Sequence, residues 1–153
     1  MHPPLGTFLT DHSAIDLWMR HLDIKRYNID MLTHRVDVDG DVNIGKYNFT
    51  QLPINFKTVT GHFNCERNQL KTLAGIPQSI FKSLSYGNNP RDCIVLPYLF
   101  NCKQHIGDGI KLSRDFYGYS AMVIINKWLE SKDILSCVDE LLDAGFEQFC
   151  KGV

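Results

Sequence analysis

The sequence lacks an excess of charge of either sign and any long hydrophobic run. Its 16 lysines and arginines nearly balance its 17 acidic residues, so the formal net charge is −1. A nucleic-acid binder usually carries a clustered basic excess, and a protein that mimics DNA needs a large acidic excess. The longest apolar run, 121–125, is far shorter than the roughly 18 residues of a membrane span. We therefore expect no nucleic-acid partner and no membrane contact.

Cysteines are few and odd in number, and they form no framework of close, even spacings. The five are Cys65, Cys93, Cys102, Cys137 and Cys150. The opening residues, Met1 followed by His2, Pro3 and Pro4, do not have the charged-then-apolar character of a signal segment. These features predict free thiols in a reducing cytosol.

The chain has the size and composition of one globular domain spanning residues 1–153. Hydrophobic residues make up 44% and charged residues 22%, which is ordinary globular usage. Asp11 or Ser13 is placed to cap a first helix, whose apolar face would be formed by Ile15, Leu17, Trp18, Met19 and Leu22. Alternating apolar residues then predict strands at 27–29 and 36–38, joined by a turn at 30–34.

An internal repeat of 21 residues occupies the centre of the chain. Segment 40–44 aligns with 61–65 and with 82–86, and the same shift aligns Val59 with Ile80. Apolar positions fall on apolar positions without insertion, and the period lies in the range of about 20–29 residues that is typical of leucine-rich repeats.

The middle copy completes the leucine-rich pattern L-x-L-x-x-N-x-L-x-x-L. It supplies Phe63, Cys65, Asn68, Leu70 and Leu73. In the first copy the asparagine position holds Tyr47, and in the third copy a leucine position holds Arg91. Outer copies depart from the pattern where a repeat array meets its caps.

These observations predict an α+β fold built on a short leucine-rich-repeat-type solenoid of about three repeats with parallel strands. A helix and hairpin at 11–39 would cap one end, the repeats would span 40–97, and helices at 98–153 would cap the other end. Ser120 would begin one helix and Ser131 or Asp133 a second, whose buried face would be formed by Ile134, Leu135, Val138, Leu141 and Leu142. Residues 99–118, with three glycines, would be a loop.

The first half of the chain resembles the leucine-rich-repeat-like proteins of tailed bacteriophages. Trp18, Ile24 and Tyr27 match a W-x-x-x-x-x-I-x-x-Y phrase, and residues 36–42 match V-D-V-x-G-D-V. Residues 52–65 match L-P-x-x-F-x-x-V-x-G-x-F-x-C, and residues 68–77 match N-x-L-x-x-L-x-G-x-P. The resemblance covers roughly residues 13–89 and departs at Lys82, where the family has glycine. It implies the repeat fold and a viral setting, and it brings no catalytic residues.

The outward positions of the repeat strands form the predicted contact surface. These positions are Asp41, Asn43, His62, Asn64, Glu66, Ser83 and Ser85, flanked by Gly45 and Gly87. A small polar face suits a protein surface better than a small molecule, which needs a concave apolar pocket. With the phage resemblance, this predicts a non-catalytic inhibitor that occupies a surface of a bacterial host protein, such as a defence factor, in the host cytoplasm. Exposed sheet edges would also permit a homodimer.

Two alternatives remain open, and two metal patterns are weak. A hydrolase or nuclease would use Cys102, His105, Asp108 and Asp115 in the tail, and a minor virion component would need no site at all. Asp37, Asp39 and Asp41 alternate, but the calcium-loop glycine and glutamate are replaced by Val42 and Asn48, so a solvated strand edge explains them. Cys93, Cys102 and His105 do not have the paired spacings of zinc ligands. We predict no metal and no cofactor.

Overall fold

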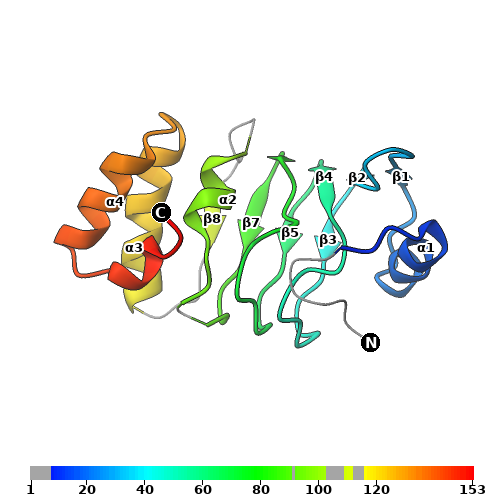
Figure 1. The fold of residues 1–153 in the computed structure, drawn as a ribbon, viewed down its shortest axis with the longest axis horizontal. Coiled ribbons are helices and arrows are strands. Elements are labelled where there is room, and N and C mark those ends of the chain that lie inside the picture. The colour runs from blue at the N-terminus through cyan, green and yellow to red at the C-terminus, as the bar shows by residue number, and fades with distance from the viewer. Residues whose placement is uncertain (1–7, 91, 103–108, 112–115) are drawn as a thin grey trace.

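The computed structural model describes residues 8–90, 92–102, 109–111 and 116–153, without the side chains of 109–111 and 116–119. It shows a mixed α+β fold with four α-helices and two sheets that contain parallel strands. The sheets occupy the middle of an elongated molecule, with α1 (His12–His21) at one end (Figure 1). Two helices, α3 (Phe116–Leu129) and α4 (Ile134–Asp143), lie at the other end.

The remaining elements are short. The strands are β1 (Tyr27–Ile29), β2 (Val36–Val38), β3 (Val42–Asn43), β4 (Phe56–Val59), β5 (Phe63–Asn64), β6 (Ser79–Ile80), β7 (Ser83–Ser85) and β8 (Gly109–Lys111). The helical elements that complete the fold are α2 (Leu96–Phe100) and a 3-10 turn, η1 (Glu147–Cys150).

From β2 to β7, successive strands alternate between the two sheets. One sheet has the order β1-β2-β4-β6 and the other the order β3-β5-β7-β8. The pair β1–β2 is antiparallel, which confirms the predicted hairpin, and its turn is fixed by Asp30, whose Oδ1 accepts from the Leu32 and Thr33 amides. The other pairs are parallel. β2 lies in the stretch predicted as a cap, yet it also pairs with β4.

Four parallel pairs, β2–β4 from Asp37 onward, β4–β6, β3–β5 and β5–β7, follow the 21-residue register of the sequence, whereas β7–β8 does not. In one sheet Val42 lies beside Phe63, and Phe63 beside Leu84. In the other sheet Val38 lies beside Val59, and Val59 beside Ile80. Successive 21-residue units therefore stack side by side.

The interior is formed by the apolar positions of these units. Val42, Phe63 and Leu84 are buried, and the rings of Phe63 and Phe56 meet edge to face at 5.2 Å between centroids. The segments that return from one sheet to the other bury Phe49 and Leu52 in one unit and Leu70 and Leu73 in the next. One continuous core results, because no single unit encloses its own apolar side.

Two buried or half-buried asparagines join neighbouring units through their side chains. Asn68 Nδ2 donates to the carbonyls of Cys65 and Ile44 at 3.1 and 3.0 Å, and its Oδ1 accepts from the Phe49 amide at 3.1 Å. Asn89 repeats this arrangement one unit later, with Tyr86, Cys65 and Leu70 as partners. The asparagine position thus satisfies backbone groups that the tight turn leaves without strand partners.

The departure from asparagine at Tyr47 has a structural reason. In the described structure β3 is the edge strand of its sheet, so an asparagine there would lack the bond to a preceding unit that Asn68 makes to the Ile44 carbonyl and Asn89 makes to the Cys65 carbonyl. Instead Tyr47 stacks on Phe49 and meets the edge of Trp18, and His21 contacts it from the same helix. The aromatic residue therefore seals the first unit against α1.

The starts of α1 and α4 agree with the capping signals. Asp11 Oδ1 accepts from the Ser13 amide at 2.9 Å, and Asp133 accepts from the amide and hydroxyl of Ser136 at 3.0 and 2.7 Å. Hydrogen bonds from the Thr33 and Leu32 amides lower the pKa of the Asp30 carboxyl in the hairpin turn. Hydrogen bonds from the hydroxyl and amide of Ser136 lower the pKa of the Asp133 carboxyl. None of the helices in the described part of the chain has the length and apolar character needed to cross a bilayer.

The prediction of a loop over 99–118 is wrong at 99–100, 109–111 and 116–118, and its residues 103–108 and 112–115 lie outside the described ones. α2 occupies 96–100 with a proline in its first turn, β8 pairs in parallel with β7, and α3 begins at Phe116 rather than near Ser120. The glycines suggested a loop, but the unpaired edge of β7 offers hydrogen bonds that local propensity does not reveal.

The predicted buried face of α4 is also partly wrong. Leu141 is buried, but Leu135 is 70% exposed and Leu142 is exposed too, while Cys137 is buried in their place. The 3-10 turn after Gly145 confirms the predicted final turn, and Phe146 and Phe149 pack there edge to face.

Candidate functional site

The predicted contact residues lie on β3, β5 and β7, at the positions just before β3 and β5 (Asp41 and His62), and in the turns that follow the strands. Asp41 and Asn43 are exposed, and His62, Asn64, Glu66 and Ser85 are half-buried. The register brings Asn43, Asn64 and Ser85 into one row. Ser83 differs, because it is only 3% exposed. We call the outward residues of these three strands and their turns the sheet face.

A hydrogen-bonded row explains the burial of Ser83. Asp41 Oδ1 accepts from the His62 amide at 2.7 Å, and His62 Nδ1 lies 2.6 Å from Ser83 Oγ and accepts from the Ser83 amide. Each link joins positions 21 residues apart. With Nδ1 acting as an acceptor, the neutral ring carries its proton on Nε2. Ser83 therefore positions His62, and His62 is the member of this pair that a partner could reach.

The asparagines of the sheet face are held by the turns that follow them. Asn43 Oδ1 accepts from the Gly45 amide at 3.1 Å, and Asn64 Oδ1 accepts from the Glu66 amide at 2.9 Å. Both side chains are thereby fixed by local bonds of the kind asparagine favours in turns. In the part of the chain that the structure describes, their Nδ2 groups make no hydrogen bond and remain donors for a partner.

Two cations missed by the sequence reasoning stand at the end of this face. Lys46 and Arg67 are exposed and adopt left-handed φ angles of 64° and 58°, and Asn88 follows at 58° in the next unit. Lys46 and Arg67 line a hollow of about 310 Å³ together with Asn43, Gly45, Asn64 and Glu66. The 21-residue spacing of positions 46, 67 and 88 was the signal that could have identified these residues, but they lie just beyond the aligned segments 40–44, 61–65 and 82–86.

Asp37 lies on β2, and Asp39 lies in the turn that follows it. β2 lies between β1 and β4, so the interpretation of these acids as a solvated strand edge is wrong for Asp37. Asp39 accepts from Thr60 Oγ1 at 3.1 Å and pairs with Arg26 at 3.6 Å. Among the described residues, no group of three or more histidine, cysteine, aspartate or glutamate side chains is arranged to hold a metal ion.

Of the four candidate residues of the hydrolase alternative, only Cys102 lies among the described residues. Cys102 is buried, and its Sγ donates to the carbonyls of Pro77 and Tyr98. Burial raises the pKa of the Cys102 thiol, and the nearby Lys132 offsets this only in part. His105, Asp108 and Asp115 lie outside the described residues. A protonated thiol donor of this kind is a poor nucleophile.

Thiol reactivity gives a direct test of this packing. Burial raises the pKa of Cys93 and of Cys137 to about 12, and it raises that of Cys65 further. Unfolded thiols have a pKa of about 8.5, so at about pH 8 we expect iodoacetamide to modify these three at least tenfold more slowly in the native protein than in concentrated urea. Peptide mass spectrometry measures each rate. Equal rates for Cys65 in both states would contradict the structure.

The same shifts give a pH dependence with a definite sign. The native thiols keep their protons where the unfolded chain releases them, so the unfolded state binds fewer protons above about pH 8.5. Their contribution to the free energy of unfolding is complete below that pH and declines as the pH rises toward 12.

Comparison with known proteins gives no match: no protein-family model, no curated protein and no solved structure is similar to the chain.

Proposed function

We propose that the chain is a non-catalytic protein-binding protein of the leucine-rich-repeat type, and that it inhibits a bacterial host factor by covering a functional surface. The observation that carries this proposal is the parallel pairing of Val42, Phe63 and Leu84. This register aligns the outward residues of successive units in rows, and such rows are the binding surfaces of repeat proteins.

The chemistry of the sheet face supports a protein partner. His62 and Asn64 are held by hydrogen bonds before any partner arrives, so little side-chain entropy would be lost on binding. Lys46, Glu66 and Arg67 place charges of both signs around the hollow. Mixed charges and fixed amide donors recognise a polar protein surface and set its orientation.

The viral setting rests on the sequence resemblance over roughly residues 13–89. A phage protein made in an infected cell meets host proteins in the cytoplasm, and a defence nuclease or another defence effector is the kind of target we propose. Steric inhibition needs a stable contact and no chemistry from this chain.

The test uses a charge swap that preserves net charge and the backbone turns. Glu66→Arg with Arg67→Glu reverses two charges of the sheet face without removing the hydrogen bonds of His62 or Asn64. The matched control is Asp23→Arg with Lys25→Glu, in the loop before β1, where Asp23 has the same φ of 58° as Arg67. Affinity capture from a bacterial lysate, followed by titration of the purified partner, measures binding to each variant.

We expect the Glu66/Arg67 swap to weaken binding at least tenfold and the Asp23/Lys25 swap to leave it within about twofold. A partner that tolerates the first swap as well as the second would place binding elsewhere on the molecule. Alanine at His62 is a less clear test, because it would also remove the contacts to Ser83.

A further inference from the structure

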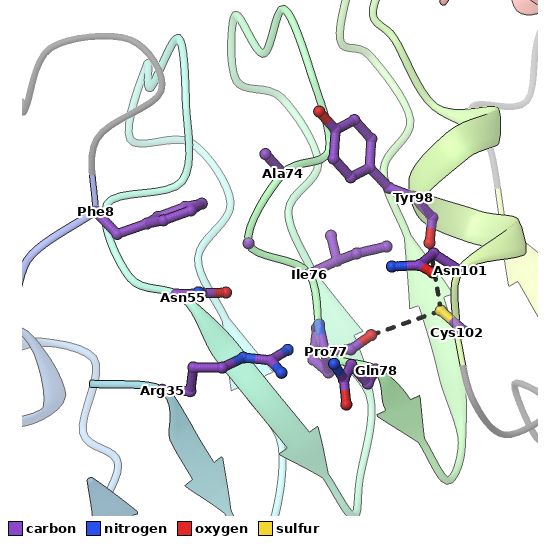
Figure 2. Close-up of a pocket in the computed structure, with 11 residues that line it drawn as sticks. Phe8, Arg35, Asn55, Ala74, Ile76, Pro77, Gln78, Tyr98, Asn101 and Cys102 are labelled. Carbon is purple, nitrogen blue, oxygen red and sulfur yellow. Dashed lines mark hydrogen bonds between the residues drawn. The ribbon is translucent and has the colours of Figure 1, made fainter. Parts of the chain in front are cut away.

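A second concave site lies beside the sheet that contains β2, β4 and β6, apart from the sheet face. It is a pocket of about 220 Å³. Arg35 and Asn55 line it just before β2 and β4, segment 74–78 lines it just before β6, and Tyr98, Asn101 and Cys102 come from α2 and the residues after it. Phe8 completes the wall (Figure 2).

Arg35 supplies the charge of the pocket. Its Nη2 donates to the Phe56 carbonyl at 3.0 Å, and its guanidinium extends toward Pro77 and Gln78 (Figure 2). Its Nε is shielded from solvent, and no atom of the described residues accepts its hydrogen. A buried donor without an acceptor costs about 1–3 kcal/mol, so an acceptor that enters the pocket would relieve this cost.

The other polar groups of the pocket are also uncommitted. Within the described ranges, the side-chain amides of Asn55, Gln78 and Asn101 make no hydrogen bond. No aspartate or glutamate is among the described residues that line the pocket, and Arg35 is the one cation among them. The described lining residues therefore offer one positive charge and several amide groups, and none of them is an anion.

We propose that this pocket binds a carboxylate group. The planar fork of an arginine matches the two oxygens of a carboxylate, and amide groups complete such a site with further hydrogen bonds. Arg35 Nε and the adjacent Nη2, whose hydrogens lie on one side of the guanidinium, would donate to the carboxylate after a small rotation of the side chain, and the second hydrogen of Nη2 would serve the Phe56 carbonyl. Phe8 and Ile76 would contact the carbon atoms next to it.

The size of the pocket limits the ligand. Pockets for drug-sized molecules occupy about 300–1,000 Å³, and this one is smaller at about 220 Å³. It suits a small carboxylic acid or the last residue of a peptide chain. Both present the same group, so the experiment must separate the two sources.

The test is a titration of the ¹⁵N-labelled full chain followed by NMR. N-acetylglycine is the carboxylate probe, and N-acetylglycinamide is its neutral counterpart of nearly equal shape. We expect saturable shifts of the Arg35 Nε–H signal and of the Gln78 and Asn101 side-chain amides with the acid, and none with the amide. Equal shifts with both probes, or shifts that do not saturate, would overturn the proposal.

Two variants test the chemistry without depending on a single substitution. Gln78→Glu keeps the size of the side chain and places an anion beside Arg35, so we expect it to fold and to reduce the affinity for N-acetylglycine at least tenfold. Arg35→Gln should do the same. Arg20→Gln, at an exposed position of α1 outside both sites, removes an equal charge and should leave the titration unchanged. A titration that Gln78→Glu or Arg35→Gln leaves unaffected would refute the site.

A last pair of probes identifies the source of the carboxylate. N-acetyl-triglycine and its C-terminal amide extend the ligand by two residues. Binding of the triglycine acid at least tenfold tighter than N-acetylglycine supports a peptide terminus, and equal affinity supports a free small acid. Binding of the triglycine amide as tight as that of its acid would overturn a carboxylate site of either kind.

Discussion

Replacing Phe63 by alanine is expected to lower the free energy of unfolding by about 3–5 kcal/mol. Phe63 is fully buried, and its strand, β5, lies between β3 and β7. Its ring contacts the ring of Phe56, which belongs to β4 in the middle of the other sheet. The loss combines the lost burial of the ring with the cavity that remains, because neighbours on both sides are held by parallel pairing and cannot collapse inward.

The matched control is Phe81→Ala, because Phe81 is 54% exposed. We expect a loss of about 1 kcal/mol or less for this variant, since much of the ring already contacts water. Urea denaturation followed by circular dichroism measures both. If the two variants lose the same stability, Phe63 does not occupy the interior of the stacked units.

Replacing Asn68 by alanine is expected to cost about 3–5 kcal/mol, although the change removes a polar residue. Asn68 is fully buried, and its amide serves backbone groups of two units, including the Tyr47 and Phe49 amides and the Ile44 and Cys65 carbonyls. Alanine leaves these groups without partners in the interior, and each buried group of this kind costs about 1–3 kcal/mol when partial relaxation does not rescue it.

Alanine variants at asparagines of different burial test whether the loss of stability comes from the buried hydrogen bonds of Asn68 or from the removal of any asparagine. Asn89→Ala removes the equivalent bonds at a half-buried position, so we expect a smaller loss of about 1–3 kcal/mol. Asn28→Ala, at an exposed position on β1, should change stability by no more than about 0.5 kcal/mol. The order Asn68, Asn89, Asn28 in urea midpoints is the expected result, and any other order would argue against the asparagine contacts described.

Local signals in the sequence were sufficient for features that depend on neighbouring residues or on one repeat length. Asp11 or Ser13 and Ser131 or Asp133 were the predicted caps, and the structure uses Asp11 and Asp133; the starts could be predicted because capping is a bond to an amide two or three residues away. The hairpin of β1 and β2 followed from alternation around a turn-forming segment.

Exposure within single elements was predicted less well. Leu135 sits on a helix whose apolar residues extend around more than one side, and the sequence does not say which side meets α3. Ser83 occupies an outward position by alternation, yet the ring of His62 covers it. In both cases the burial of a residue depends on a neighbour from another element.

The sequence by itself determined the stacking register, because the 21-residue period places Val42, Phe63 and Leu84 in equivalent apolar positions. Only the tertiary structure decided that residues 109–111 extend a sheet and that Arg35 faces Gln78 across a pocket. A repeat fixes each unit against the next through contacts that recur along the chain. A free strand edge or a pocket takes its partner from whatever segment the finished fold brings near, and no periodic pattern encodes that choice.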